Sequence, residues 1–165
     1  MNEQLYGKIL YHSKVGYLTI LSDKHYIRRI AFGKQELPEE IYIDNNHPMI
    51  MQAEQQLKEY LDGKREIFDL PYQIHGTAFQ KSVWNVLTEI PYGSTKTYGM
   101  IAKEIGSSKA ARAVGRACHC NPIVIVIPCH RVIGTNGSLT GFAGGIPVKE
   151  NLLQMEANQN HKSRN

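Results

Sequence analysis

The pattern of apolar and polar positions changes its period near the middle of the chain. Short apolar stretches separated by turn residues open the sequence and predict a β-meander, with strands at Leu5–Tyr11, Gly16–Leu21 and Tyr26–Phe32. The segment 36–48 is polar, acidic and flanked by proline, which predicts a loop. Apolar residues at helical spacing predict a helix over Met49–Leu61 that stops at Gly63. A fourth strand is a candidate at 67–70, and 71–76 is the expected linker.

The second half of the sequence has the spacing of helices. Thr77 and Gln80 match a capping box, so a helix is predicted to start here and to end before Pro91. Two shorter helices are predicted at Tyr98–Ile105 and Ser108–Cys120, with Gly106 making the turn between them. Two short helices joined through glycine are typical of a helix-turn-helix motif. The polar tail from Ala157 onwards is expected to fray.

Length and charge distribution refine this picture. With 165 residues, the chain is long enough for two small domains, which we place at 1–73 and 74–165. The net charge is +4, and it is unevenly spread: residues 90–131 carry six Lys or Arg against Glu104 alone. A local surplus of +5, six minus one, is typical of a nucleic-acid surface, although a solvated basic face would look the same.

The predicted second helix of the motif separates small residues from basic ones. At about 100° per residue, its basic side chains fall within about 80° of each other, namely Lys109, Arg112, Arg116 and His119. The opposite side carries the small and apolar residues Ala110, Val114, Ala117 and Cys118. This segregation is what a helix that faces DNA requires.

Cysteine usage and hydropathy bear on the compartment. The three cysteines are Cys118, Cys120 and Cys129, and no secretion signal precedes them, which indicates free thiols in a reducing compartment, the cytoplasm. A zinc site needs about four ligands, so Cys-x-Cys with scattered histidines predicts no metal. No apolar run approaches the ~18 residues of a membrane span, so we expect no membrane association.

The most informative segment is the apolar run Ile123–Ile127 together with the residues directly after it. Five β-branched residues predict a buried interior strand that Pro128 ends. Cys129 then lies at the rim of this core, next to His130 and Arg131, two groups that can favour its thiolate. The alternative is that Cys129 is a small buried apolar residue, as most unpaired cysteines are.

The segment 127–132, Ile-Pro-Cys-His-Arg-Val, resembles the active-site signature of the O6-alkylguanine-DNA alkyltransferases, the methylated-DNA–protein-cysteine methyltransferases. Further motifs of that family occur in the same order, namely Pro91-Tyr92-Gly93, Thr97-Tyr98, 110–115, Asn121-Pro122, 141–145 and Lys149-Glu150. The match runs from about Thr77 to Glu156 and is weak over the first seventy residues.

The resemblance implies an α/β fold, in which a small ribonuclease-H-like N-terminal domain packs on a mainly helical C-terminal domain with a winged-helix-like helix-turn-helix. It implies DNA repair by direct reversal: an irreversible, stoichiometric transfer of the alkyl group from O6-alkylguanine, or O4-alkylthymine, to the protein after base flipping. The expected partner is double-stranded DNA, bound by a monomer through the minor groove, and no cofactor is implied.

The family also implies roles for individual residues. Cys129 would be the nucleophile, and His130 would remove its proton through a water molecule. Glu150 would orient His130, although an acid in the first turn of a helix after Pro147 is favoured by the helix dipole anyway. Tyr98 would donate a hydrogen bond or proton to guanine, unless it is simply a core aromatic residue. Asn121 would act as a hinge that positions the active site, unless it serves only turn chemistry.

The remaining implied residues contact DNA or the alkyl group. Arg112 would be the finger that fills the gap left by the flipped base, the alternative being a phosphate contact. Other implied DNA contacts are Thr97, Lys109, Ala110, Ala111, Ala113, Gly115 and Arg116. Phe142, Ala143 and Gly144 would wall the alkyl pocket. Many members carry tyrosine at the first of these positions and some carry serine at the second, so substrate range is open.

Three other functions compete with this interpretation. A catalytically silent alkyltransferase-like protein binds lesions without repairing them, but such proteins lack the cysteine that is present here as Cys129. A Cys-His hydrolase would leave the helix-turn-helix unexplained. A redox- or metal-sensing regulator that uses Cys118, Cys120 and Cys129 would not react with alkylguanine.

Overall fold

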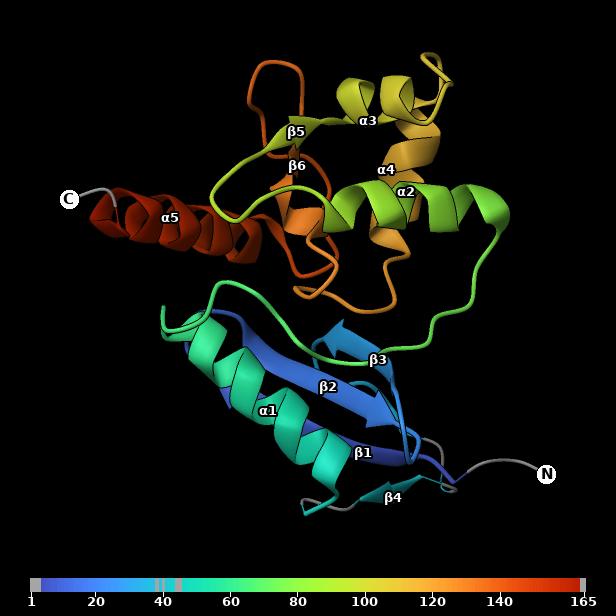
Figure 1. Cartoon of the computed structure of the whole chain (residues 1–165), viewed down its shortest axis with the longest axis vertical. Helices are drawn as coiled ribbons and strands as arrows, with labels where there is room; N and C mark the ends of the chain where they lie inside the picture. Colours follow the sequence, from blue (N-terminus) through green and yellow to red (C-terminus); the bar gives the residue numbers. More distant parts are fainter. Residues whose placement is uncertain (1–3, 38, 40, 44–45, 164–165) are drawn as a thin grey trace. The chain divides into compact units, whose positions relative to one another are not determined.

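A computed structural model describes residues 4–37, 39, 41–43 and 46–163. The chain divides into two compact units, 1–74 and 75–165 (Figure 1). No helix among the described residues is long and apolar enough to cross a membrane.

The first unit is a small sheet covered on one face by a helix (Figure 1). The sheet has the order β3-β2-β1-β4, in which β1 and β2 and then β2 and β3 are antiparallel and β4 is parallel to β1. The strands are β1 (Tyr6–His12), β2 (Gly16–Ser22), β3 (Ile27–Phe32) and β4 (Tyr42–Ile43). Helix α1 (Pro48–Leu61) buries its apolar face, and the core is formed by Leu10, Leu18, Ile20, Ile30, Ile50 and Leu57.

The predicted meander and helix of this unit are confirmed within about one residue at each end, but two details of the prediction are wrong. The predicted loop 36–48 contains the short strand β4, while residues 38, 40, 44 and 45 lie outside the described ones. The segment 67–70 is not a strand, and Ile67 is exposed. The chain instead pairs with β3 slightly later, where the amide of Ile27 donates to the Pro71 carbonyl over 2.8 Å.

The second unit is mainly helical. Its elements are α2 (Ala78–Thr88), β5 (Lys96–Thr97), α3 (Tyr98–Glu104), α4 (Ala111–His119), the 3₁₀ turn η1 (Cys129–Arg131), β6 (Val132–Ile133) and α5 (Ile146–Ser163). Helices α2, α3 and α4 pack against each other around Val83, Trp84 and Leu87. The fraying expected from Ala157 is wrong as far as Ser163, because α5 continues to that residue, and residues 164 and 165 lie outside the described ones.

The two helices predicted for the helix-turn-helix are α3 and α4, and Gly106 joins them with a left-handed φ of 80°. Helix α4 begins three residues later than predicted because the amide of Ala110 donates to the Ser107 carbonyl in a turn. The segregation of its faces is confirmed: Val114, Ala117 and Cys118 are buried. Arg112, Arg116 and His119 are exposed.

The prediction of an interior strand over Ile123–Ile127 is wrong, although four of its five residues are buried. The segment is a tight turn in which the amide of Ile127 donates to the Ile123 carbonyl over 2.9 Å. Ile125 has a φ of 73°, which is strained for a β-branched residue and incompatible with a strand. Buried backbone groups must find hydrogen-bond partners, and here they find them within the turn rather than on a neighbouring strand.

The capping box at the start of α2 is present as predicted. The amide of Gln80 donates to Thr77 Oγ1 over 3.1 Å, and the amide of Thr77 donates to Gln80 Oε1 over 3.0 Å. This box fixes where the second unit begins its first helix.

We expect Thr77→Ala to lower the free energy of unfolding of the second unit by about 1 kcal/mol, because an N-terminal amide of α2 loses its acceptor. Urea denaturation followed by circular dichroism measures the change. Thr88→Ala is the matched control, because Thr88 is exposed at the other end of α2 and its side chain donates only to the Asn85 carbonyl. Equal losses for the two variants would contradict the role of the cap.

Candidate active site

The thiol of Cys129 lies at the start of η1 and is 4% exposed. The tight turn before it sets its position, since the amide of Cys129 donates to the Ile127 carbonyl over 2.8 Å. Burial raises the pKa of this thiol. Four groups oppose that effect: a hydrogen bond from the Asn121 side chain, the charge of Lys149, and the backbone amides of Cys129 and His130. The resting group is therefore a thiol with donors already placed for its anion.

Asn121 ties the end of α4 to the turn that carries Cys129. Its Nδ2 donates to the Ile127 carbonyl over 2.7 Å, and its Oδ1 accepts from the amide of Ile123 over 3.0 Å. Its own amide donates to the Cys118 carbonyl over 3.2 Å. The residue therefore satisfies turn chemistry and links α4 to the thiol at the same time.

His130 is fully buried, and its carboxylate partner is Glu156 rather than Glu150. Nε2 of His130 lies 2.7 Å from Glu156 Oε2. Glu150 is exposed, and its side chain accepts from Gln154 Nε2 over 3.3 Å. The expectation for Glu150 is wrong because of helix phase: at about 100° per residue, Lys149 and Glu156 share the buried side of α5, and Glu150 points away from it.

Glu156 links α5 to two segments that are distant from it in sequence, η1 and the loop at Gly93. Its Oε1 accepts from Arg131 Nε over 2.8 Å and from the amide of Gly93 over 3.1 Å. Arg131 Nη2 donates to Oε2 over 3.0 Å, and Arg131 Nη1 donates to the Ile90 carbonyl over 2.7 Å. We call Glu156, His130 and Arg131 the buried carboxylate cluster.

Protonation states follow from this cluster. Burial by itself would raise the pKa of Glu156, but the hydrogen bonds and charges of His130 and Arg131 hold it well below its usual range. Burial lowers the pKa of His130, and Glu156 only partly opposes this. An ionised carboxylate thus supports a neutral imidazole, which is able to accept a proton.

A short parallel pairing brings Tyr98 to the site. Strand β5 pairs with β6, with Lys96 opposite Val132 and Thr97 opposite Ile133, so α3 begins beside the segment that follows Cys129. Thr97 accepts the amide of Met100 as the N-cap of α3. Nothing in the hydropathy pattern indicates so short a pairing, and sequence reasoning missed it.

Lys149 is a further site residue that sequence reasoning passed over. Its side chain is 1% exposed, and Nζ donates to Tyr98 Oη over 3.5 Å. The ammonium lies 5.7 Å from the centres of both the Tyr98 and Phe142 rings. Burial lowers its pKa, and a negative charge on the Cys129 or Cys118 sulfur favours its charged form. Its helical spacing could have revealed it, because Lys149 is a charged residue at a position of α5 where the spacing predicts an apolar one.

Helices α3 and α4 and the loop 134–141 surround a cavity of about 860 Å³. Residues lining it include Tyr98, Ala111, Arg112, Gly115, Arg116 and Thr140. Five of the sixteen sequence-predicted site residues line this cavity, and Cys129 is not one of them. Lys109 and Ala110 precede α4, Ala113 is half-buried on it, and Phe142, Ala143 and Gly144 follow the lining residue Gly141. The cavity is therefore lined both by α4, the predicted DNA-binding helix, and by Tyr98, the predicted proton donor.

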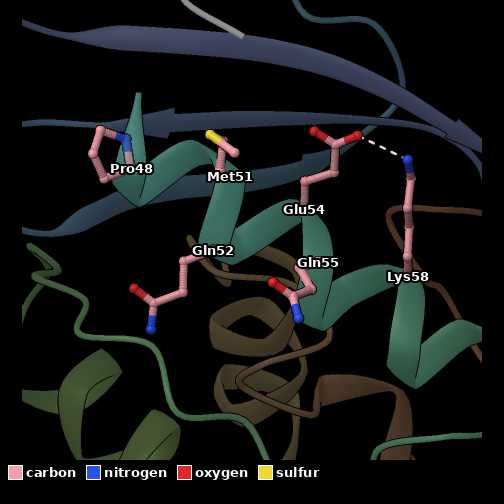
Figure 2. Close-up of a pocket in the computed structure, with 6 residues that line it drawn as sticks. All are labelled: Pro48, Met51, Gln52, Glu54, Gln55 and Lys58. Carbon is pink, nitrogen blue, oxygen red and sulfur yellow. Dashed lines mark hydrogen bonds and ion pairs between the residues drawn. The ribbon is translucent and has the colours of Figure 1, made fainter. Parts of the chain in front are cut away.

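A second hollow, of about 600 Å³, lies along α1 in the first unit (Figure 2). Figure 2 shows that its lining side chains include Glu54 and Lys58, which form an ion pair of 2.8 Å, with Met51 beside them. Its six lining residues include no cysteine, serine or histidine. Within the part of the chain that the structure describes, no group of three or more His, Cys, Asp or Glu is placed to hold a metal ion.

The buried thiol, imidazole and carboxylate belong to a unit that also carries two helices joined by a glycine turn. Comparison with known proteins identifies the class of protein to which this unit belongs. Residues 78–158 match the DNA-binding domain of 6-O-methylguanine DNA methyltransferase, and residues 7–74 match the ribonuclease-like domain of the same family. A methylated-DNA–protein-cysteine methyltransferase of Methanosarcina acetivorans is 46% identical over 149 residues, covering 89% of this chain and 96% of the relative. That of Haemophilus influenzae is 42% identical, covering 88% and 83%.

Solved structures agree with the sequence relatives. The structure of Mycobacterium tuberculosis OGT in complex with DNA matches with a TM-score of 0.85 and 39% identity, covering 93% of this chain and 94% of that one. The chain belongs to the methylated-DNA–protein-cysteine methyltransferase family. The resemblance inferred from the Ile-Pro-Cys-His-Arg-Val motif is thereby confirmed, as is the division into a small N-terminal sheet domain and a helical C-terminal domain.

We expect Glu156→Gln to lower the free energy of unfolding by about 3 kcal/mol at neutral pH, because Arg131 would keep a buried charge without its carboxylate. The Glu156 contribution is fully present above the ordinary carboxyl pKa of 4.5 and is lost as the pH falls through the lower folded value. The free energies of unfolding of wild type and variant, measured by denaturant titration, should therefore converge as the pH is lowered from neutral to acid.

Glu150→Gln is the matched control, because Glu150 is exposed on the same helix. Its expected change lies within about 0.5 kcal/mol at every pH. A larger loss for this variant than for Glu156→Gln would restore Glu150 as the partner of His130.

Proposed function

We propose that the chain repairs DNA by moving an alkyl group from O6 of guanine to the sulfur of Cys129 in a single turnover. The observation that carries this proposal is a buried thiol with donors placed for its anion, next to a neutral imidazole that an ionised carboxylate supports. The names of the relatives supply the reaction class, and the site supplies the residues.

Removal of the thiol proton is the first step. Because Nε2 of His130 is hydrogen-bonded to Glu156, proton exchange with Cys129 uses Nδ1, through a bridging water. The imidazolium that forms is stabilised by Glu156, as in other nucleophile–histidine–acid arrangements. Asn121, Lys149 and two backbone amides then hold the thiolate.

Alkyl transfer is the second step and proceeds by in-line attack. The Cys129 sulfur forms a bond to the alkyl carbon as the bond from that carbon to O6 breaks, and the electron pair passes to guanine. Burial raises the pKa of Tyr98, so its hydroxyl stays protonated at neutral pH and can donate to the departing base. The product is a thioether, which the proposed site has no group to hydrolyse, so each molecule acts once.

A stacked base cannot reach a buried thiol, so the reaction requires base flipping. We propose that α4 docks in the minor groove and that Arg112, exposed on the cavity rim, fills the gap left in the stack. Further backbone or groove contacts are assigned to Thr97, Lys109, Ala110, Ala111, Ala113, Gly115 and Arg116. The flipped base enters the cavity, where Tyr98 is the donor.

The pocket for the alkyl group is assigned to Phe142, Ala143 and Gly144. The Phe142 ring lies 5.7 Å from the Lys149 ammonium, which supports a place beside the thiol. We propose O4-alkylthymine as a second lesion that the site repairs. We further propose that the first unit is ribonuclease-H-like and acts as a scaffold, and that the second unit is winged-helix-like. The protein acts on DNA as a monomer. Its free thiols suit a cytoplasmic location.

The deciding experiment is intact-protein mass spectrometry after incubation with a duplex that contains one O6-methylguanine. We expect a stoichiometric gain of one methyl group, mapped to Cys129, without turnover. Cys129→Ser should bind the duplex and gain nothing. Tight lesion binding by wild type without any adduct would instead support a catalytically silent lesion-binding protein.

Arg112→Ala tests the role of the finger. We expect methyl transfer from the duplex to slow by about tenfold or more, because unstacking costs a few kcal/mol that the arginine offsets. Transfer from the free base O6-methylguanine should be unchanged, since no extrusion is needed. Lys109→Ala removes the same charge and is the matched control. It should weaken duplex binding by an amount that depends on the salt concentration, as the loss of a phosphate contact does. Equal slowing with the free base would contradict a finger role.

A further inference from the structure

The hydroxyl of Tyr98 is the point at which three separate elements of the second unit meet. Thr140 Oγ1, from the loop 134–141, donates to Tyr98 Oη over 3.4 Å. Lys149 Nζ, from α5, donates to the same oxygen over 3.5 Å. Tyr98 and Thr140 both line the cavity between α3 and α4, so the meeting point lies at the wall of that cavity. The proposed reaction uses Tyr98 but gives Thr140 no part.

The pairing of β5 with β6 brings Thr140 to Tyr98. Thr97 of β5 lies opposite Ile133 of β6, and the pairing is parallel, so the chain leaves both strands at the same end. Tyr98 directly follows the first of these residues, and the loop 134–141 directly follows the second. One short strand pair therefore anchors both the phenol and the loop that carries Thr140.

The loop itself is closed by its own backbone. The amide of Gly134 donates to the Ser138 carbonyl over 2.8 Å, and the amide of Gly137 donates to the Gly134 carbonyl over 2.9 Å. Gly137 has a left-handed φ of 79°, which glycine adopts without strain. The closure is tight, because a Cβ at Gly134 would lie 2.3 Å from Ser138 Oγ. Thr140 thus follows a closed turn.

The hydrogen bonds at the Tyr98 oxygen determine the direction of its own proton. A hydroxyl has one proton to donate and two lone pairs that accept, whereas an ammonium only donates. Lys149 and Thr140 therefore occupy the two lone pairs, and the remaining capacity of the oxygen is its proton. The open side of Tyr98 is the cavity that it lines. Both contacts are at the long end of the hydrogen-bond range, so each orients the hydroxyl weakly and the two act together.

We propose that Thr140 is a positioning residue, which acts with Lys149 to turn the Tyr98 proton into the cavity and so makes an acceptor on the ring of the flipped base a condition of fast alkyl transfer. The inference rests on the proposed role of Tyr98 as donor to guanine. It specifies the substrate class as a purine that presents an unprotonated ring nitrogen to Tyr98. A base with an N–H at that place would set two donors against each other and leave both unsatisfied.

The chemistry of the leaving group explains why such a donor accelerates the reaction. As the bond from the alkyl carbon to O6 breaks, the electron pair that passes to guanine spreads over the purine ring. The ring nitrogens then become stronger acceptors than they were in the intact lesion. A donor that is already turned toward one of them stabilises this charge without reorganisation.

The test compares single-turnover rates of methyl transfer from four duplexes. One contains O6-methylguanine, and in each of the other three one ring nitrogen of that base, N1, N3 or N7, is replaced by C–H. The proteins are wild type, Tyr98→Phe, Thr140→Val, Thr140→Ser and Ser138→Ala. Thr140 is exposed, so valine removes its hydroxyl without disturbing a core, and serine retains the hydroxyl. Ser138→Ala is the matched control, because it removes a hydroxyl from an exposed position of the same loop that does not line the cavity.

With O6-methylguanine we expect Thr140→Val to react about fivefold more slowly than wild type, because one weak orienting hydrogen bond is lost. Thr140→Ser should recover most of this rate, and Ser138→Ala should react as wild type does. Wild type and Tyr98→Phe should react equally fast with one of the three analogues, which identifies the nitrogen that accepts from Tyr98. With that analogue Thr140→Val should show no further loss.

A loss of the same size on all four duplexes would assign Thr140 a purely structural role and overturn the inference. An unchanged rate of Thr140→Val with O6-methylguanine, an equal loss in Ser138→Ala, or the lack of any analogue that equalises wild type and Tyr98→Phe would also overturn it. Wild type that accepts no methyl group from O6-methylguanine removes the proposed function, and this inference with it. Wild type that reacts, while Thr140→Val shows no loss that depends on the acceptor, removes this inference alone.

Discussion

The site depends on one buried carboxylate. Glu156 on α5 binds His130 and Arg131 of η1 and the amide of Gly93 in the loop before β5. An ion pair taken out of water gains little net energy, but removal of one member leaves a charge that the interior cannot solvate. The cluster therefore makes the packing of α5, η1 and the 91–93 loop interdependent, and it forms only when all three are in place.

At Cys129, too, the cost of burying a charge is opposed by groups that the fold holds in place. A thiol 4% exposed is protected from bulk solvent, and burial raises its pKa, so it is not continuously anionic. The groups that oppose the effect of burial are fixed by the fold: an asparagine held by its own turn, a lysine 5.7 Å from the centres of two aromatic rings, and two backbone amides. Such preorganised donors act when charge develops, without reorganisation at that moment.

The tight turn over Ile123–Ile127 shows how a correct burial prediction can give a wrong element. Five β-branched residues are buried equally well in a strand or in a compact turn, and hydropathy does not distinguish the two. The choice was made by backbone hydrogen bonds, which the turn satisfies internally and through Asn121. The consequence for the site is direct, because a turn delivers Cys129 next to the end of α4 instead of at the edge of a sheet.

Local features were readable from the sequence because their causes are local. The capping box of α2, the glycine between α3 and α4, the two faces of α4 and the adjacency of Cys129 to His130 all depend on residues within one or two turns of each other. The family motifs added Cys129 as the proposed nucleophile. Glu150 was the predicted carboxylate because it stands next to Lys149 in a family motif.

Only the tertiary structure could decide which carboxylate meets His130 and which cation meets Cys129. Glu156 is 26 residues from His130, and Lys149 reaches Tyr98 across 51 residues. The phase of α5 decides which of its residues face the interior, but packing decides what they meet there. Charges separated in sequence select each other only when burial removes water as the alternative partner, and that happens only in the folded chain.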